Sequence, residues 1–200
     1  MAVTKTVPIE DILAVVGHGV AAVGENRVQE AREKVAQLPE SVERHGIGRL
    51  QTNKARDAVR LFHLVHGLDR PELAVALDRA AAPTGQPCRV LVQVNVAGSE
   101  GQGGLLPQDL NGFIEFCAKL PYLRMDGMMA IGPHAVPAGV VRESFRTARE
   151  LFRQAAGHPN AGPAFTILSL GMSGDFEDAV EEGSTLVRIG TAIFGERRHE

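Results

Sequence analysis

The chain has 200 residues, of which 44% are hydrophobic, and its formal net charge at pH 7 is −3. This composition excludes a largely disordered chain and a nucleic-acid-binding protein held by a general basic surface. No apolar run approaches the ~18 residues of a membrane-spanning helix, and the first residues lack the apolar core of a secretory signal. The length suits a single domain, which we expect to cover residues 1–200. The two cysteines are too few for a disulfide framework, so we expect the protein in the reducing cytoplasm.

Short apolar segments alternate with segments of helical spacing along the whole sequence. The apolar segments predict eight strands, several of them apolar throughout, as expected for parallel strands that are covered on both faces. The predicted strands are Ala2–Thr4, Val20–Val23, Arg44–Ile47, His63–Val65, Arg89–Val94, Arg124–Met129, Phe165–Leu168 and Leu186–Ile189.

Five segments between these strands have the periodicity of amphipathic helices. They are Arg27–Leu38, Pro71–Ala82, Gln108–Leu120, Val140–Ala156 and Asp175–Glu182. Strands that alternate with helices of this length predict right-handed β-α-β units. Eight such units favour an α/β fold of the (β/α)8 TIM-barrel type over an open sheet, although the chain is short for such a barrel.

In a (β/α)8 barrel the chemistry lies where each strand ends, so the residues after the predicted strands are candidates. Lys5 follows the first strand. A lysine near a terminus is often simply solvated, but desolvation at a barrel mouth would lower the pKa of its amine and free it for Schiff-base chemistry. Asn26 follows the second strand and, with Gln29 three residues later, has the pattern of a helix N-cap and its capping-box partner. The same position also faces the barrel mouth.

The strand ends in the middle of the chain give weaker signals. The loop from His45 to Lys54 is rich in polar side chains, as functional loops and merely solvated loops both are. Gln93 and Asn95 stand at the end of a buried strand, so barrel neighbours or a ligand must satisfy their amides. His63 and His66 have no third ligand at metal spacing, and we interpret both as structural.

The loops after the last two strands contain glycines and hydroxyl side chains, in Ser169–Asp175 and Gly190–Gly195. Barrels often hold a phosphate at these two loops, at the start of a short helix, so we favour a phosphate site over a pair of tight turns. Arg188 shares one face of the last strand with Gly190, and its guanidinium needs a protein carboxylate or a ligand acceptor if it is buried.

Two long motifs are the most specific in the chain, LSLGMSGDF at Leu168–Phe176 and VRIGTAIFGER at Val187–Arg197. Further matching segments are Val3–Thr6, Gly24–Glu30, His45–Lys54, Gln93–Val96 and Gly127–Ile131. On these segments the chain resembles, from residue 2 to about residue 198, the YggS/PROSC family of pyridoxal phosphate homeostasis proteins. These proteins look like the N-terminal barrel of alanine racemase standing alone, so the resemblance implies a fold-type III barrel without the C-terminal β domain.

The resemblance implies pyridoxal 5′-phosphate (PLP) as the cofactor. The implied cofactor-binding residues are Lys5, Asn26, Ser173, Arg188, Gly190 and Thr191. In the family the lysine holds PLP as a Schiff base, the arginine faces the pyridine nitrogen, and the asparagine lies near the ring. The serine, the glycine and the threonine hold the phosphate.

The chain departs from the family pattern in several places. Gly46 stands where the family usually has phenylalanine, Leu170 replaces a usual methionine, and Gln102 replaces a usual lysine. We expect the change at Gly46 to loosen the packing beneath the third loop. Family members also carry a helix and a fuller first strand ahead of the lysine motif, and only four residues precede Lys5, so we expect a form that lacks this N-terminal helix.

A racemase needs two bases on opposite faces of the substrate, and in alanine racemase the second is a tyrosine from the C-terminal domain. The only tyrosine of this chain, Tyr122, precedes the sixth predicted strand and should lie at the opposite, non-catalytic face of the barrel. We therefore expect a PLP-binding regulator or carrier and not an enzyme, with PLP-dependent apo-enzymes as candidate partners. A weak PLP-dependent amino-acid racemase and a sugar-phosphate enzyme without PLP are the alternatives. The sequence pattern leaves no large apolar face over, so we expect a monomer.

Overall fold

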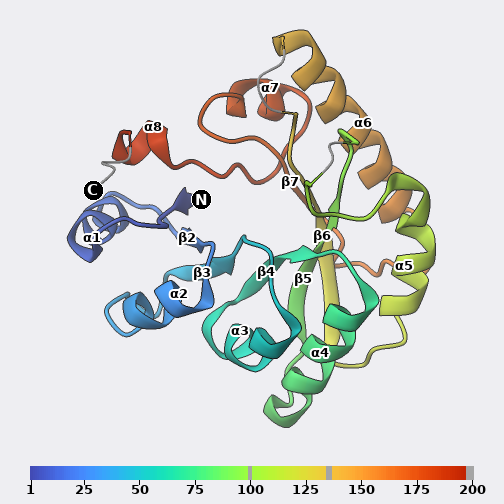
Figure 1. The fold of residues 1–200 in the computed structure, drawn as a ribbon, viewed down its shortest axis with the longest axis horizontal. Coiled ribbons are helices and arrows are strands. Elements are labelled where there is room, and N and C mark those ends of the chain that lie inside the picture. The colour runs from blue at the N-terminus through green and yellow to red at the C-terminus, as the bar shows by residue number, and fades with distance from the viewer. Residues whose placement is uncertain (99–100, 134–136, 197–200) are drawn as a thin grey trace.

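The computed structural model describes residues 1–98, 101–133 and 137–196. Within these ranges seven strands form one parallel sheet in chain order, curled toward a barrel (Figure 1). The strands are β1 (Ala2–Val3), β2 (Ala22–Glu25), β3 (Glu43–Gly46), β4 (Leu64–Leu68), β5 (Cys88–Val94), β6 (Leu123–Ala130) and β7 (Ile167–Ser169). Each strand pairs in parallel with the next one along the chain. This is the topology of a (β/α)8 barrel, so the predicted fold class is confirmed.

The eighth predicted strand, Leu186–Ile189, joins the two edges of the sheet without forming a regular strand. Its first residue forms an isolated parallel bridge to Ser169 of β7, and its last residue forms one to Ala2 of β1. Just before it, the Thr185 hydroxyl accepts the backbone N–H of Leu168 at 2.8 Å. A side chain thus occupies a ladder position that a strand carbonyl would fill, and the prediction of a regular strand was wrong.

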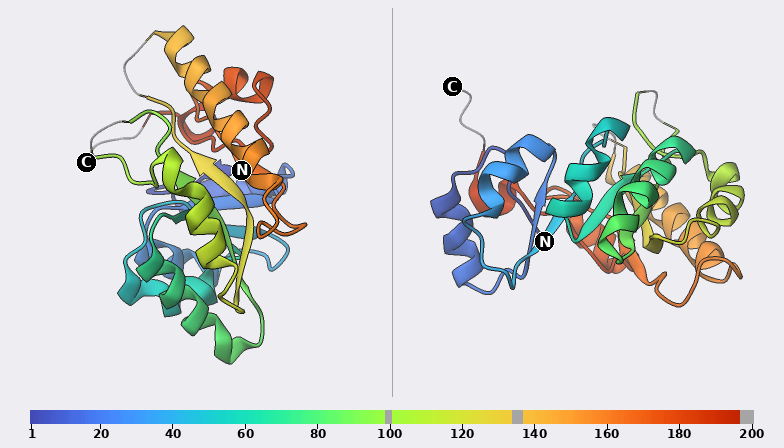
Figure 2. Two further views of the ribbon diagram at one scale, coloured as in Figure 1. Left: turned by 90° about the vertical axis from the view of Figure 1, so that its right-hand side faces the viewer. Right: turned by 90° about the horizontal axis from the view of Figure 1, so that it is seen from below.

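The helices lie outside the sheet (Figure 2). They are α1 (Ile9–Gly17), α2 (Val28–Val35), α3 (Ala55–Leu61), α4 (Pro71–Ala81), α5 (Leu110–Cys117), α6 (Ala138–Ala156), α7 (Phe176–Glu181) and α8 (Thr191–Phe194). All five predicted helices are present, with ends shifted by a few residues. Helices α1, α3 and α8, of 9, 7 and 4 residues, were not predicted. No helix in the described ranges has both the length and the apolar character needed to cross a membrane.

The inner face of the sheet changes character along the strands. Leu64, Leu91 and Met129 pack together as a small apolar cluster. Two residues further along β4 and β5, the same face carries His66 and Gln93, both buried. The barrel interior is therefore apolar in the middle and polar toward the carboxyl ends of the strands.

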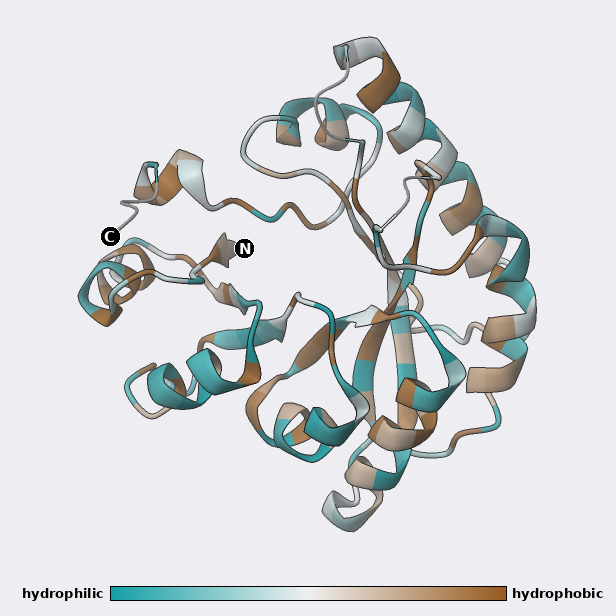
Figure 3. Ribbon diagram, viewed as in Figure 1, coloured by the Kyte–Doolittle hydropathy of each residue, from teal (hydrophilic) through white to brown (hydrophobic). Residues whose placement is uncertain are grey.

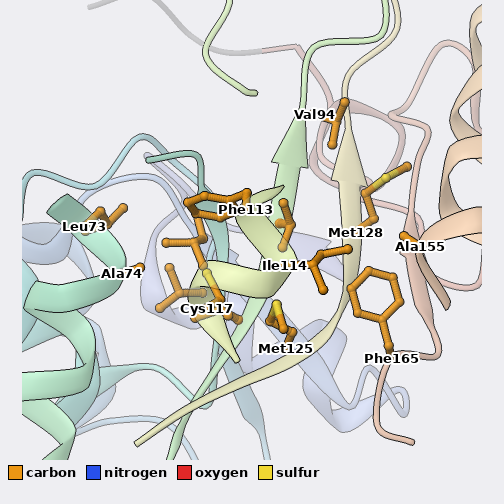
Figure 4. Close-up of a cluster of buried hydrophobic side chains, with 14 of the residues drawn as sticks. Leu73, Ala74, Val94, Phe113, Ile114, Cys117, Met125, Met128, Ala155 and Phe165 are labelled. Carbon is orange, nitrogen blue, oxygen red and sulfur yellow. The ribbon is translucent and has the colours of Figure 1, made fainter. Parts of the chain in front are cut away.

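The larger apolar core lies between the sheet and the outer helices. Figure 4 shows side chains from α4, α5 and β6 meeting there, and Phe113 and Ile114 of α5 are among the buried members. Figure 3 shows that the helices carry both hydrophobic and hydrophilic residues, as expected for helices that cover a core on one face only. A separate small cluster, Ile12, Val23 and Val42, lies under α1 and β2.

The space beneath the third loop is filled, contrary to the expectation from Gly46. A Cβ built on Gly46 would lie 2.7 Å from Cδ2 of the Phe62 ring. The ring of Phe62 thus occupies the volume that a side chain at position 46 would need, and the expected loosening of the packing was wrong.

Candidate functional site

Lys5 follows β1 and lines a pocket of about 570 Å³ at the carboxyl end of that strand. Gly190 and Thr191 line the same pocket from the other end of the sequence. They meet because α8 lies beside α1 (Figures 1 and 2). The volume is typical of small-molecule sites. The pocket therefore brings together three of the six residues singled out from the sequence.

The turn that carries Lys5 has an unusual backbone. Thr6 has a φ of +63°, which is rare for a β-branched residue and marks local strain. The carboxylate of Glu30 in α2 accepts the backbone N–H of Thr6. The Thr6 hydroxyl donates to the carbonyl oxygen of Lys5 at 2.6 Å. These two bonds hold the strained turn and so fix the backbone of Lys5.

A buried polar network supports this turn from below. Lys34 of α2 donates from Nζ to Oε1 of Glu25 at 2.9 Å and to the carbonyl oxygen of Thr4 at 2.7 Å. The Thr4 hydroxyl donates to the same Glu25 oxygen at 2.5 Å. Burial raises the pKa of Glu25, while the bonds from Thr4 and Lys34 oppose the rise. This network was not predicted from the sequence, although a glutamate at the end of a buried strand is a signal that could have revealed it.

Ser173 links the loop after β7 to the start of α8. Its hydroxyl oxygen accepts the backbone N–H groups of Gly190 and Ala192 at 3.0 and 3.2 Å. Two N–H groups that converge on one oxygen at the start of a helix can also bind an oxygen of an anion. The two loops that suggested a phosphate site therefore meet at one point.

Arg188 lies inside the barrel and is 5% exposed. Its Nη1 donates to the carbonyl and the hydroxyl oxygen of Ser169 at 2.9 and 2.7 Å, and its Nη2 donates to the carbonyl oxygen of Ala130 at 3.0 Å. These three acceptors are neutral oxygens, and none of them belongs to a carboxylate. Burial lowers the pKa of Arg188 to about 10, so the guanidinium remains charged at neutral pH. Of its five N–H hydrogens, two have no acceptor among the described residues.

A chain of hydrogen bonds leads from Arg188 across the barrel to the surface; we call it the histidine relay. Ser169 Oγ lies 3.4 Å from Nδ1 of His66, whose Nε2 lies 3.0 Å from Nδ1 of His45. Nε2 of His45 lies 3.0 Å from Oε2 of Glu43. Because a guanidinium can only donate and a carboxylate can only accept, the order of the partners assigns every bond as donating from Arg188 toward Glu43.

The relay requires both of its imidazoles to be neutral. Burial lowers the pKa of His45 and lowers that of His66 well below its usual value. The bond from His45 in turn lowers the pKa of Glu43, so that carboxyl stays ionised. The interpretation of His66 as structural agrees with these contacts. The sequence analysis did not foresee the relay, because its members come from three strands and from the segment that closes the barrel.

Asn26 is exposed and does not line the Lys5 pocket. It is not the N-cap of α2 either: that position is Arg27, with no side-chain capping bond, so the N-cap prediction was wrong. The reason is a close crossing of two loops. A Cβ on Gly48 would lie 2.3 Å from the carbonyl oxygen of Asn26, so this backbone is held against the third loop and the helix begins later.

The remaining candidates have protein partners. Gln93 donates from Nε2 to the carbonyl oxygen of Gly103 at 2.7 Å. His63 accepts the backbone N–H of Arg44 at 3.0 Å. Tyr122 directly precedes β6 and therefore lies at the amino ends of the strands, as predicted. Among the described residues no group of three or more histidine, cysteine, aspartate or glutamate side chains could hold a metal ion.

A parallel (β/α)8 barrel with a lysine after its first strand, and with loops rich in glycine and hydroxyl side chains after its last two strands, is a barrel of the alanine racemase type. Residues 1–198 match the family model described as "Alanine racemase, N-terminal domain". Alanine racemase of Clostridium difficile 630 superposes with a TM-score of 0.81 over 100% of this chain and 55% of that chain. At 16% identity this likeness shows the fold alone.

More similar relatives narrow the class. A pyridoxal phosphate homeostasis protein of Aquifex aeolicus is 42% identical over 98% of this chain and 86% of its own length, and one of Escherichia coli K12 is 37% identical over 98% and 85%. PipY of Synechococcus elongatus, solved with PLP bound, has a TM-score of 0.88 at 35% identity, covering 98% of this chain and 91% of that chain. The chain belongs to the pyridoxal phosphate homeostasis proteins, within the alanine racemase N-terminal domain family.

Proposed function

We propose that the protein binds PLP and acts in intracellular PLP homeostasis as a carrier or regulator, without a dedicated turnover reaction. The observation that carries this proposal is the pocket that joins Lys5 to Gly190 and Thr191, with Ser173 bonded to Gly190. An amine that reacts with aldehydes and donors that bind a phosphate thus meet at one cavity. The relatives named for PLP homeostasis, and PipY with PLP bound, support it.

The residues fit PLP group by group. Lys5 would hold the aldehyde carbon as a Schiff base. The N–H groups that now converge on Ser173 would donate to the phosphate, together with the Thr191 hydroxyl. One of the two remaining N–H hydrogens of Arg188 would donate to the pyridine nitrogen. Asn26, on the loop after β2, is a proposed contact near the ring.

The same residues favour binding over turnover. PLP supplies, when bound, a ring that withdraws electrons from the atoms attached to its aldehyde carbon. An arginine beside the pyridine nitrogen keeps that nitrogen unprotonated and weakens this effect. A racemase also needs a second base, and the single tyrosine, Tyr122, lies at the other end of the barrel. We therefore propose a non-catalytic role, with a weak amino-acid racemase as the alternative.

Borohydride reduction of the protein mixed with PLP tests the site at one residue. Peptide mass mapping should find the pyridoxyl group on Lys5, and Lys5→Ala should lose both the label and the PLP absorbance. Lys119→Ala is the matched control, because Lys119 is an exposed lysine near the carboxyl end of α5. Labelling spread over several lysines, or an unchanged spectrum in Lys5→Ala, would contradict the proposal.

Two further measurements test the role. Incubation with L-alanine should give no D-alanine above the Lys5→Ala background, and a clear excess would support the racemase. PLP-loaded protein should restore the activity of a PLP-dependent apo-enzyme. If the apo-enzyme recovers no activity while free PLP restores it, the protein is not a carrier to that partner.

A further inference from the structure

A second pocket lies at the carboxyl ends of β2, β3 and β4. Its volume is about 850 Å³. It shares no lining residue with the Lys5 pocket, but Asn26, the proposed contact near the PLP ring, is one of its lining residues. Four of its lining side chains are cationic: Arg27 after β2, Arg49 and Lys54 after β3, and Arg70 after β4. No aspartate or glutamate lines it. We call this cavity the arginine pocket.

Contacts between the three loops build the arginine pocket in advance. The first two loops touch through their backbones, since a Cβ on Gly48 would lie 2.3 Å from the carbonyl oxygen of Asn26. The third loop is tied to the second by Arg70, whose Nη2 donates to the carbonyl oxygen of Leu50 at 2.6 Å. Nη1 of Arg70 is held by Asp69 at 2.5 Å. A ligand would therefore meet walls that are already in place, which lowers the entropic cost of binding.

The charge of this pocket is not balanced within the described part of the chain. The side chains of Arg27, Arg49 and Lys54 form no hydrogen bond or ion pair there, whereas Arg142 on α6 pairs with Glu182 at 2.7 Å. The chain as a whole carries a net charge of −3, so carboxylates are not scarce. Like charges gathered around one cavity repel each other, and they attract anions.

We propose that the arginine pocket binds a small phosphorylated molecule that carries at least two negative charges. Guanidinium groups match phosphate oxygens through paired N–H donors, and Arg27 and Arg49 approach from two different loops, with the Lys54 amine beside them. The cavity has the volume of a small-molecule site. Gln51 and Thr52 add neutral donors that would orient the ligand.

Inorganic pyrophosphate is the probe, and isothermal titration calorimetry at low salt is the measurement. The protein is loaded with PLP first, so that the proposed phosphate site at Ser173, Gly190 and Thr191 is occupied and cannot take up the probe. Binding should weaken about tenfold or more in the variant Arg27→Gln/Arg49→Gln/Lys54→Gln, and it should weaken steeply as salt is added. The matched control Arg60→Gln/Arg79→Gln/Arg153→Gln removes three exposed, unpaired arginines elsewhere in the described chain and should bind as the unmodified protein does.

Three results would overturn the proposal. One is equal weakening in the two triple variants, which would indicate a general charge effect. Another is pyrophosphate binding that disappears on loading with PLP, which would place the probe at the Ser173 loop. The third is binding of an oligonucleotide or a polyglutamate peptide far tighter than that of pyrophosphate, which would make this a macromolecular surface. The proposal does not depend on the role of Lys5, because protein that fails to take up PLP can be titrated in the same way.

Discussion

Replacing His66 by leucine should cut the histidine relay without opening a cavity. His66 is 0% exposed, and leucine has nearly its volume. The substitution removes the donor to Nδ1 of His45 and the acceptor that faces Ser169 Oγ, at 3.0 and 3.4 Å. Leaving a buried polar group without its partner costs about 1–3 kcal/mol of folding free energy. The loss of the 3.4 Å contact with Ser169 Oγ costs less than the loss of the 3.0 Å bond to His45. We therefore expect His66→Leu to lower the free energy of unfolding by about 2–4 kcal/mol.

The pH dependence gives this prediction a second readout. In the folded protein the pKa of His66 lies well below its ordinary value of 6.5, because of burial and the neighbouring positive charges. The unfolded imidazole takes up a proton as the pH falls through about 6.5, and the folded one does not. The stability contributed by His66 is thus present above about pH 6.5 and is lost on acidification, by up to about 1.4 kcal/mol per pH unit.

Urea unfolding followed by circular dichroism at pH 7.5, 6.5 and 5.5 measures both effects. His66→Leu should lose stability at pH 7.5 and show a shallower decline toward pH 5.5 than the unmodified protein. His66→Gln, which can still donate and accept, is the control and should lose about 1 kcal/mol at pH 7.5. A His66→Leu protein as stable as the unmodified one, or a decline of unchanged steepness, would refute the relay.

Three further outcomes are expected. Lys34→Met should lower the free energy of unfolding by about 3 kcal/mol, measured by thermal unfolding, because it leaves the Glu25 carboxylate buried without its cation. Adding Glu25→Gln should recover most of this loss, and no recovery would contradict the ion pair. Ser173→Ala should raise the Kd for PLP by about tenfold in a spectroscopic titration and should also lower the melting temperature slightly, because it removes the acceptor of the Gly190 and Ala192 N–H groups. Unchanged affinity would remove Ser173 from the site. Gly48→Ala should destabilise the fold by about 2 kcal/mol, since its Cβ would meet the carbonyl oxygen of Asn26, and a neutral effect would mean that this loop crossing is loose.

The part of the site that lies directly after strands could be predicted from the sequence. Lys5 and the loops that carry Ser173 and Gly190 were singled out by one rule, that the carboxyl ends of parallel barrel strands share one face, and the individual residues of the two loops came from the family resemblance. The rule works because strand order fixes which loops become neighbours. The capping pattern was the less reliable signal: it predicted Asn26 as the N-cap of α2, whereas the backbone of Asn26 contacts the third loop and the N-cap is Arg27.

The contacts inside the barrel could not be predicted in this way. His66 and Ser169 are 103 residues apart, and they meet only because the sheet curls until β4 and β7 face each other. The alternation of residues along a strand predicts on which face of the sheet a side chain lies, but not which residue lies opposite it across the barrel interior. The same limit explains why Phe62, and not residue 46, fills the space beneath the third loop.

The small apolar cluster of Ile12, Val23 and Val42 has a consequence for the lifetime of any bound molecule. It ties α1 to β2 separately from the larger core. The neighbouring β1 has only two residues and contributes none of them to the cluster. The quarter of the chain that carries Lys5 can therefore open at a lower free energy than the whole barrel unfolds. Amide hydrogens of Ala22–Glu25 should therefore exchange with solvent faster than those of Cys88–Val94. Such local opening would let a molecule bound at Lys5 leave while the rest of the fold stays intact.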